Sequence, residues 1–572
     1  MASAHGWEEP TPSRIIACLR ANRAEAIALA SIILLAGLLR LSDLPNRGGW
    51  DSDQGTEMLA LWNALHSGQI PQLGPAASVG GFHHGALYYY LLLPAVWLGR
   101  GDPAWVLLEI SLAGLLVVPA VWWVGRSIGG PGAGLVAAFV AATADSLIMF
   151  SGFIWNATLV QPASALALVG VWQAWNSRRP RWWLLAAAGT AVAMQAHVAA
   201  AVLLLPVGAA WLASLKRGPS AQRRRILGWG AVSIGLVLFT YTPLIAYELS
   251  HDFAETRALI AFAIGPGSAA AHGLAARLAI GWLRCLAWPL TGWPLFRGGS
   301  TPMFQLPTSS DLVWPVIAAG ILLLGLIWRA TWAAIAVRRA ASAGEPEGRS
   351  PVVGPAVPAV HSEMREGERA GTLLIVGSLI AMITALALLL SPVSQMSTVL
   401  VEQYHVVVDP FVVVAVGLVL GALWNARIPH AFLRMACRAM VFVALSGLLA
   451  WNALAWTSLT GPNPSWHDAQ QAATRIEGDA SGQPIGSVAL PYTPSFETYA
   501  YPLIRDGVTM AAPAQAPIVV VMCDSSGMDG CGGPVEEAWL ANQMPGTTMT
   551  LIDRFAANSA RTISVYRRSA AP

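Results

Sequence analysis

Two clusters of polar residues early in the sequence have types and spacing suited to group-transfer chemistry. The first is the run Gly49-Trp50-Asp51-Ser52-Asp53-Gln54-Gly55-Thr56-Glu57-Met58, in which two aspartates are separated by one serine. The second is Phe82-His83-His84-Gly85-Ala86-Leu87-Tyr88-Tyr89-Tyr90, in which adjacent histidines precede three tyrosines. A carboxylate beside a reacting carbon can act as a general base, and a histidine can orient that base or contact a phosphate.

The aspartate pair also suits the start of a helix. Between residues 54 and 66 the apolar side chains fall on one face, as in an amphipathic helix that lies on a membrane: Met58, Leu59, Trp62 and Leu65. Aspartate is a favoured N-cap, and the helix dipole favours acids there. Because capping accounts well for only one acid, we predict Asp53 as the first catalytic candidate and Asp51 as the second.

The composition indicates which elements must position these residues. Of the 572 residues, 55% are hydrophobic and 11% are charged, against roughly 25% charged in soluble globular proteins. These proportions exclude a soluble enzyme, a disordered chain and a secreted disulfide scaffold. The formal net charge of +3 is too small to indicate a nucleic-acid partner. Since roughly 20 apolar residues span a bilayer as helix, we predict a polytopic α-helical membrane protein with about 11–13 transmembrane helices.

Positively charged loops indicate the orientation of the chain, because such loops are retained in the cytoplasm. They predict a cytoplasmic N-terminus at residues 1–25 and a transmembrane domain over 26–456, with outer loops at 46–85 and 248–311 and a cytoplasmic loop at 335–370.

One part of this topology stays open. Four apolar segments lie between residue 85 and the arginines at 178–181, whereas the predicted orientation requires an odd number. Either the short segment 86–100 does not cross fully, or these arginines lie outside.

Residues 460–572 are less hydrophobic and predict a small extracytoplasmic α/β domain. Strands are predicted at 485–490, 517–522 and 562–566, and helices at 496–504 and 535–542. Cys523 and Cys531 flank a turn there. They could form a disulfide in an oxidising compartment or stay as two free thiols.

The order of these motifs resembles the membrane-embedded glycosyltransferases of the GT-C superfold, and among them family 39, with the protein O-mannosyltransferases and aminoarabinose lipid transferases as relatives. In that family an Asp-Glu pair starts the interfacial helix, and His-Pro-Pro-Leu starts the second span. Asp53-Gln54 and His84-Gly85-Ala86-Leu87 occupy these places here. Since Gln54 replaces the usual glutamate, we expect Gln54→Glu to be tolerated.

The resemblance implies an enzyme that moves a hexosyl or pentosyl group from a polyprenyl-phosphate donor to a hydroxyl of a lipid, glycan or protein. Asp53 would be the base, and the anomeric carbon would be inverted. The resemblance and the outer-loop positions predict these substrate-binding residues: His83, His84, Tyr88, Gln54, Glu57, Arg257, Arg284, Glu402, Tyr404 and His405. Arginines suit a phosphate, although they also snorkel to lipid headgroups, and the tyrosines also suit an interfacial aromatic belt. The expected location is a bacterial cytoplasmic (inner) membrane.

A metal and a transport function are the alternatives. A divalent cation could bind the acids Asp51 and Asp53, but such a pair is a weak signal, and we predict no metal or other cofactor. A lipid or solute transporter or flippase would carry its polar groups inside the spans. Asp145 and Asp409 are the acids to test for that role.

Overall fold

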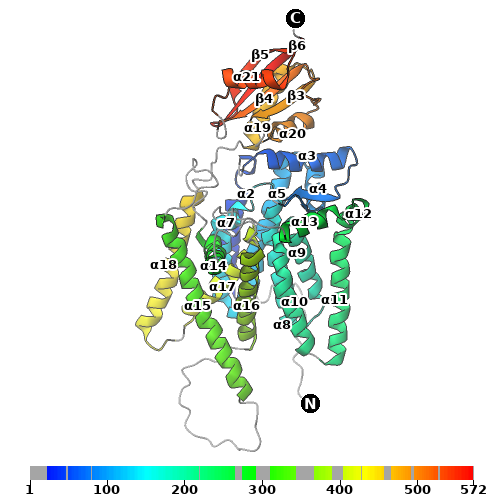
Figure 1. Ribbon diagram of the computed structural model, residues 1–572. Helices are drawn as coiled ribbons and strands as arrows, with labels where there is room; N and C mark the ends of the chain where they lie inside the picture. The colour runs from blue at the N-terminus through cyan, green and yellow to red at the C-terminus, as the bar shows by residue number, and fades with distance from the viewer. Residues whose placement is uncertain are drawn as a thin grey trace, which may run out of the picture.

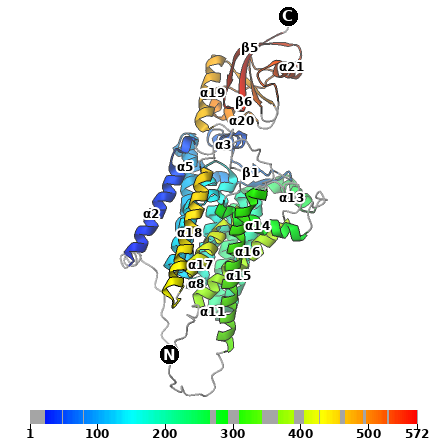
Figure 2. The same ribbon diagram turned by 90° about the vertical axis from the view of Figure 1, so that its left-hand side faces the viewer.

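The computed structural model describes these residues: 22–46, 49–78, 80–217, 219–264, 274–291, 309–342, 366–389, 404–426, 428–456, 465–490, 495–525 and 529–570. Long helices run side by side in an elongated bundle, and a small α/β domain sits on one end of it (Figure 1). A view at right angles shows the same arrangement (Figure 2). We refer to this end of the bundle as the domain end and to the opposite end as the far end.

The helices of the bundle are α2 (Arg23–Leu41), α4 (Leu87–Leu98), α5 (Pro103–Gly129), α6 (Pro131–Thr143), α8 (Val160–Ser177), α9 (Trp182–Ala196), α10 (Leu204–Arg217), α11 (Ser220–Thr240), α14 (Leu274–Thr291), α15 (Ser309–Ser342), α16 (Glu366–Leu389), α17 (Asp409–Trp424) and α18 (Ala431–Trp456). Shorter elements join them: η1 (Leu44–Asn46), α3 (Ser52–His66), β1 (Leu73–Ala76), β2 (His83–Gly85), α7 (Asp145–Met149), η2 (Asn156–Leu159), η3 (Val198–Leu203), α12 (Thr242–Ser250), α13 (Ala254–Ile264) and η7 (Val406–Val408).

Among the described residues, eight helical segments are long and apolar enough to cross a membrane, and the bent pair α11–α12 makes a ninth. The shorter apolar helices α6 and α9 also run between the two ends. α6 begins where α5 ends at the far end, and its last carbonyls bind Arg40 at the domain end. α9 ends at Ala196, whose carbonyl binds Asn156 at the domain end. By length and composition, the described part of the chain has eight or nine candidate spans, fewer than the roughly 11–13 predicted.

The helix α4 begins and ends at the domain end. It follows β2 directly, and the carbonyl of Gly101, just past its end, accepts a hydrogen bond from Tyr501 of the α/β domain. The predicted span 86–100 therefore does not cross. Because α5, α6 and α8 remain, an odd number, the arginines at 178–181 lie at the far end.

Helices occupy parts of two of the predicted loops. α15 continues to Ser342 and α16 begins at Glu366, so helices occupy both ends of the predicted loop 335–370. The alanine-rich end of α15 has a high helix propensity, which explains its extra length. The predicted outer loop 248–311 contains α14, whose apolar face is buried against α15 and α16.

A buried arginine fixes α2 to α6 at the domain end. Arg40 is 0% exposed, and its guanidinium donates to the carbonyls of Ala141 at 2.7 Å and Ala142 at 3.0 Å. The last carbonyls of a helix lack partners within the helix. The arginine satisfies them and holds the chain that leads into α3.

The α/β domain has a four-stranded sheet in the order β3-β4-β6-β5. Its elements are α19 (Trp466–Ala480), β3 (Ile485–Leu490), α20 (Glu497–Arg505), β4 (Ile518–Asp524), α21 (Pro534–Gln543), β5 (Thr547–Ala556) and β6 (Arg561–Ala570). β3 and β4 are parallel, whereas β6 is antiparallel to both β4 and β5. A disulfide joins Cys523 and Cys531, which confirms the predicted pairing.

The α/β domain contacts the bundle mainly through α20, which lies on α3. Gly55 of α3 is so close that an added Cβ would meet the carbonyl oxygen of Glu497 at 2.1 Å. The Trp50 ring lies 4.6 Å from the Trp466 ring, and its Nε1–H donates to the Thr498 carbonyl at 2.7 Å. The domain thus covers the start of α3, where the acid pair lies.

Candidate active site

A reciprocal cap fixes the start of α3. Asp51 is the N-cap, and its carboxylate accepts from backbone N–H groups of the first turn, while Gln54 Oε1 accepts from the Asp51 N–H at 2.9 Å. The capping role considered from the sequence is therefore confirmed for Asp51. Gln54 Nε2 donates to the Ile154 carbonyl at 2.9 Å. Both ends of the Gln54 amide are in use, which explains a glutamine at this position.

Asp53 is the acid that the cap does not use. Within the described part of the chain its carboxylate accepts no hydrogen bond and forms no ion pair, and its residue surface is exposed. Enough protein surrounds the carboxyl group that desolvation raises its pKa, and the charge of Asp51 raises that pKa further. A free carboxylate with a raised pKa has the properties of a general base.

Glu57 lies one helical turn after Asp53 and is buried. The Tyr88 hydroxyl and the Asn156 backbone N–H both donate to its carboxyl group. Burial raises the pKa of Glu57 to about 8; these hydrogen bonds oppose the rise, and the charge of Asp53 adds to it. At neutral pH Glu57 therefore carries a proton, and the negative charge of α3 is concentrated at the aspartate pair.

Asn156 links this acid cluster to an aromatic and histidine cluster. Its Nδ2 donates to the carbonyl of Ala196 at 2.5 Å, and the next residue is His197. The His197 ring lies between two others, 4.9 Å from the His84 ring and 5.0 Å from the Tyr404 ring. Side chains from β2, the α9–η3 junction and the start of α17 therefore meet at the domain end.

The electrostatics of this cluster keep His84 neutral. His84 is buried, and desolvation, followed by the nearby His83, lowers its pKa to about 4. Its Nδ1 has no hydrogen-bond partner among the described atoms. His405 is buried close enough to interact electrostatically with His197. Neutral His84 can exchange a hydrogen bond with a bound molecule, but it adds no positive charge.

His83 joins the first outer loop to α13. Its backbone N–H donates to Glu255 Oε2 at 2.6 Å, and its ring Nδ1 lies 3.1 Å from Glu255 Oε1. The sequence analysis singled out Arg257 in this segment and missed Glu255. A single glutamate in a long loop has no spacing that identifies its partner.

Gly85 has a steric reason to replace the proline of the resembling family. A Cβ at Gly85 would meet the side chain of Gln195 at 2.4 Å. Gln195 Oε1 accepts from the Leu87 N–H at 3.3 Å, and its Nε2 donates to Thr240 Oγ1 at 2.8 Å. Gln195, another residue that the sequence analysis missed, fills the space that a proline ring would need.

The remaining predicted residues are dispersed. Arg257 is exposed on α13 and Arg284 is buried on α14. In the described part of the chain neither arginine forms an ion pair with Asp53 or Glu57. Glu402 lies outside the described residues.

The α/β domain adds a cation that the sequence analysis missed. Arg561, the first residue of β6, is 2% exposed. Its Nη2 donates to Asp51 Oδ1 at 2.8 Å, and its Nε donates to Asp524 Oδ2 at 2.8 Å. The first contact joins residues 510 positions apart, so only the fold reveals it.

The structure describes the acids that the sequence suggested for a metal or for transport. Among the residues that the structure describes, no group of three or more His, Cys, Asp or Glu side chains is placed to hold a metal ion. Asp409 is buried at the start of α17 and accepts a hydrogen bond from Gln161 Nε2 at 2.6 Å. Asp145 is buried in α7.

Comparison with known proteins identifies the fold but gives no match by sequence: no family model and no curated protein matches the chain. Among solved structures, ArnT from Cupriavidus metallidurans bound to undecaprenyl phosphate matches with a TM-score of 0.50 and 13% identity, over 94% of this chain and 97% of that one. The archaeal oligosaccharyltransferase AglB from Archaeoglobus fulgidus, in complex with an inhibitory peptide and a dolichol-phosphate, has a TM-score of 0.44 and 14% identity. That match covers 80% of this chain and 58% of AglB.

The chain shares the GT-C-type fold of ArnT, as the order of its motifs predicted. The ArnT match carries this assignment, because it extends over nearly the full length of both chains. The predicted order of a GT-C-like helical domain followed by a small C-terminal α/β domain is confirmed.

Proposed function

We propose that the protein is a glycosyltransferase of the family 39 type, which moves a sugar from a polyprenyl-phosphate donor to an acceptor hydroxyl, with Asp53 as the base. The observation that carries this proposal is the state of Asp53. Its carboxylate has no partner in the described chain, has a raised pKa, and projects from a helix fixed between the bundle and the α/β domain. ArnT, which shares the fold, was solved with undecaprenyl phosphate.

The proposed step is a single displacement. Asp53 takes the proton of the acceptor hydroxyl while the hydroxyl oxygen bonds to the anomeric carbon. The bond from that carbon to the phosphate oxygen breaks, polyprenyl phosphate leaves, and the anomeric carbon is inverted. The carboxylate of Asp51 is engaged by the cap and by Arg561, which leaves Asp53 available to the acceptor.

The histidine and tyrosine cluster is suited to the sugar. Neutral His84 and the buried Tyr404 offer hydrogen bonds for sugar hydroxyls, with His405 behind them. Arg257 is the better candidate for the phosphate, because it is exposed two residues from the partner of His83. Arg284 and Glu402 remain predicted substrate-binding residues, and the described contacts do not connect them with Asp51 or Asp53.

The orientation belongs to the same proposal. The arginine-rich turns at 178–181 and 216–225 lie at the far end, which we assign to the cytoplasm. The site and the α/β domain then face the extracytoplasmic side of a bacterial inner membrane. The disulfide between Cys523 and Cys531 supports this assignment, because disulfides persist in oxidising compartments.

Turnover of a synthetic radiolabelled polyprenyl-phosphate sugar by the purified protein tests the proposal. Asp53→Asn is expected to lower turnover about 10²–10⁴-fold, the usual contribution of a general base, with an unchanged thermal unfolding midpoint. Asp43→Asn is the matched control, because Asp43 is an exposed acid before α3 that is bonded to Asn46 at 2.8 Å.

Each other outcome has a separate meaning. Wild-type turnover by Asp53→Asn would reject Asp53 as the base and keep the reaction. No turnover by the wild type over a panel of donors would count against the enzyme. The alternative, a polytopic lipid or solute transporter or flippase, would then be tested by movement across vesicles.

A further inference from the structure

We propose that Arg561 is a positioning residue for the reaction, which holds Asp51 and thereby sets the place and the electrostatic surroundings of Asp53. This inference rests on the proposed function, because Asp53 is the base only there. It gives the α/β domain a direct part in the chemistry, through a side chain that lies far from the acids in sequence.

The contacts of Arg561 bridge the two parts of the molecule. Its guanidinium donates to Asp51 of the bundle and to Asp524 of β4, both at 2.8 Å, and it is almost fully buried. Thr498 Oγ1 approaches the same Asp51 oxygen at 3.4 Å. Charge-assisted hydrogen bonds of this kind are short and directional. The start of α3 is therefore held by the α/β domain as well as by its own cap.

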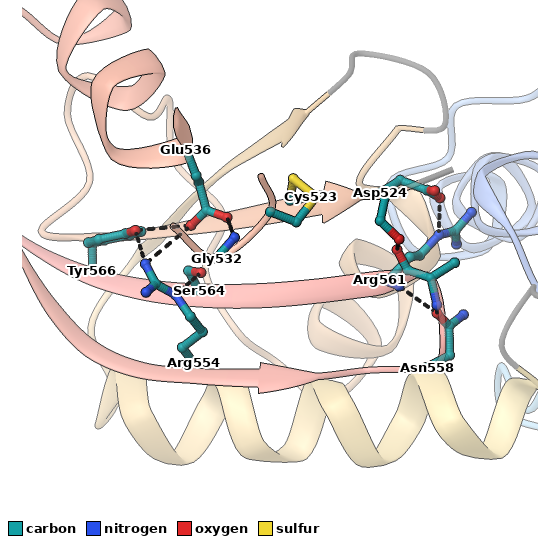
Figure 3. Close-up of a disulfide and its surroundings, with 12 residues drawn as sticks. Cys523, Asp524, Gly532, Glu536, Arg554, Asn558, Arg561, Ser564 and Tyr566 are labelled. Carbon is teal, nitrogen blue, oxygen red and sulfur yellow. Dashed lines mark hydrogen bonds and ion pairs between the residues drawn. A yellow bond between two sulfur atoms is a disulfide. The ribbon is translucent and has the colours of Figure 1, made fainter. Parts of the chain in front are cut away.

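Rigid elements present the guanidinium. Arg561 pairs with Asp524 in the register of β4 and β6, and its backbone N–H donates to Asn558 Oδ1 at 2.7 Å (Figure 3). Cys523, which precedes Asp524, is tied to Cys531 by the disulfide. Both the cation and its second carboxylate thus lie at the ends of paired strands and not on a free loop.

The loss of this cation has a defined electrostatic consequence. Without Arg561, the Asp51 charge next to Asp53 would be uncompensated, and a negative neighbour disfavours ionisation of a carboxyl group. Asp53 would then keep its proton to a higher pH and would be inactive as a base over a wider acidic range. A merely structural role would lower the amount of folded protein and leave this pH range unchanged.

The test is the pH profile of donor turnover. The donor is a phosphodiester and does not titrate near neutrality. The fall of turnover at low pH, the acidic limb of the profile, therefore reports a group of the protein. Arg561→Gln is expected to move that limb upward by about one pH unit, a modest shift for a neighbouring charge. Arg561→Lys keeps the charge and should leave the limb in place. Asp51→Asn combined with Arg561→Gln removes both charges and should return the limb toward the wild-type position.

Arg554→Gln is the matched control. Arg554 lies on β5 and pairs with Glu537 at 3.2 Å. It also contacts Tyr566 (Figure 3), and both partners belong to the α/β domain itself. Its loss should leave the acidic limb unchanged.

An unmoved limb in folded Arg561→Gln would overturn the inference. If Arg561→Gln does not fold, the double variant is compared with Asp51→Asn alone: a limb at higher pH in the double variant supports the inference, and equal limbs overturn it. Failure of the proposed function gives a different result: the wild type would turn over no donor, or Asp53→Asn would turn over donor like the wild type and so reject Asp53 as the base.

A separate observation at the far end carries a second inference. A small pocket that is partly open to solvent lies among the ends of α8, α9, α10 and α11. Arg178, Arg217, Ser214 and Gln222 are among its lining residues. The Arg217 guanidinium lies 3.8 Å over the ring of Trp175, another lining residue. The pocket therefore combines two cations, small polar groups and an aromatic wall.

Both arginines are exposed at the rim of the pocket. In the described part of the chain neither guanidinium donates a hydrogen bond, and each is close enough to repel the other. Glu366 attracts Arg217 but forms no ion pair with it. Arg178 ends α8 in the left-handed conformation, with φ 55°, at the rim of the same pocket. Two like charges facing one cavity favour an anion between them.

We infer that this pocket binds a phosphate group, supplied by an anionic lipid headgroup or by a free phosphate ion. Arginine suits a phosphate because its planar donors contact two oxygens at once. Basic pockets between membrane helices on the cytoplasmic side are suited to lipid headgroups. The inference does not depend on Asp53 or on the reaction.

Thermal unfolding of the detergent-solubilised protein separates the two sources. Phosphatidylglycerol should raise the midpoint more than phosphatidylcholine if the ligand is a headgroup, whereas inorganic phosphate alone should raise it if the ligand is the free ion. Replacing Arg178 and Arg217 together by glutamine should lower the affinity for whichever ligand raises the midpoint roughly tenfold. The control replaces Arg224 and Arg225, which are exposed on α11 outside the pocket lining.

If both double variants lowered the ligand affinity equally, the effect would come from the basic surface in general and not from the pocket. That result would overturn the inference. So would a midpoint that neither phosphatidylglycerol nor inorganic phosphate raises above its value in phosphatidylcholine.

Discussion

At the scale of single residues, three carboxyl groups of one short segment differ because their surroundings differ. Asp51 is engaged by the helix cap and by a buried arginine, Asp53 is open, and Glu57 is buried against Tyr88. The same chemical group therefore serves as an anchor, as a proposed base and as a neutral hydrogen-bonding residue.

Glu57→Gln is expected to stabilise the protein at alkaline pH and to change little at acidic pH. Burial raises the pKa of Glu57 from the ordinary glutamate value of 4.5 to about 8 in the folded protein. Because the folded state binds the proton more tightly, the wild type loses stability as the pH rises from 4.5 to about 8. Glutamine does not ionise, so the advantage of the variant should grow over this window by a few kcal/mol, on the order of magnitude that linkage gives.

Thermal unfolding near both edges of this pH window measures the effect. Glu477→Gln on the exposed face of α19 is the control, and its difference from the wild type should not grow with pH. A constant difference for Glu57→Gln as well would show that Glu57 is ionised in the folded protein.

Gln54→Glu, which the family resemblance led us to expect as tolerated, is now expected to destabilise the protein. The Ile154 carbonyl would lose its donor and face a carboxylate, and an unsatisfied buried group costs about 1–3 kcal/mol. A protonated glutamate can still donate, so the loss should shrink at acidic pH. Unfolding midpoints at neutral and acidic pH check this, with the exposed Gln471→Glu as control. An unchanged midpoint at neutral pH would restore the original expectation.

Local spacing was informative for some site residues and not for others. The acid pair and the adjacent histidines stand out because short runs of polar residues are unusual in so apolar a chain. Glu255, Gln195 and Arg561 have no such context. Their roles arise from contacts between distant segments, which no local pattern encodes.

At the scale of elements, the contact between α3 and α20 depends on a glycine. Gly55→Ala is expected to lower the unfolding midpoint, because its Cβ would meet backbone at 2.1 Å and backbone cannot move as a flexible side chain can. Gly37→Ala on α2 is the control, since nothing lies within 4 Å of the added Cβ. There the gain in helix propensity, about 1 kcal/mol, favours the variant.

The measurement is thermal unfolding together with donor turnover at a temperature where both variants are folded. Gly55→Ala should lose turnover as well, because α3 would shift from the α/β domain. A wild-type midpoint for this variant would mean that the two elements are less closely packed than described.

The elements that could be predicted are those with a strong periodic or apolar signal. β4 reads as a continuous buried strand, and it is buried throughout. β5 was missed because most of its residues are partly exposed at the edge of the sheet, where little alternation is required. α4 was predicted as a helix, but its failure to cross follows from contacts at its two ends and not from its composition.

At the scale of the whole molecule, the path of α4 fixes on which side each loop lies. Cysteines introduced at Ser67 and Arg100 are expected to react with a membrane-impermeant maleimide from the same side, whereas one at Arg181 should react only after the membrane is opened. All three positions are exposed. The unsubstituted protein gives the background from native cysteines. Labelling at Arg100 from the side of Arg181 would show that α4 crosses.

The contact between Asp51 and Arg561 also has a consequence for the order of synthesis. The two residues are 510 positions apart, so the arginine emerges roughly 25 to 100 s after the aspartate at ordinary translation rates. During that interval α3 exists without the cation and without α20 above it. A nascent chain therefore carries an unfinished site until β6 pairs with its neighbours. The bundle can insert before that moment, but activity can begin only after it.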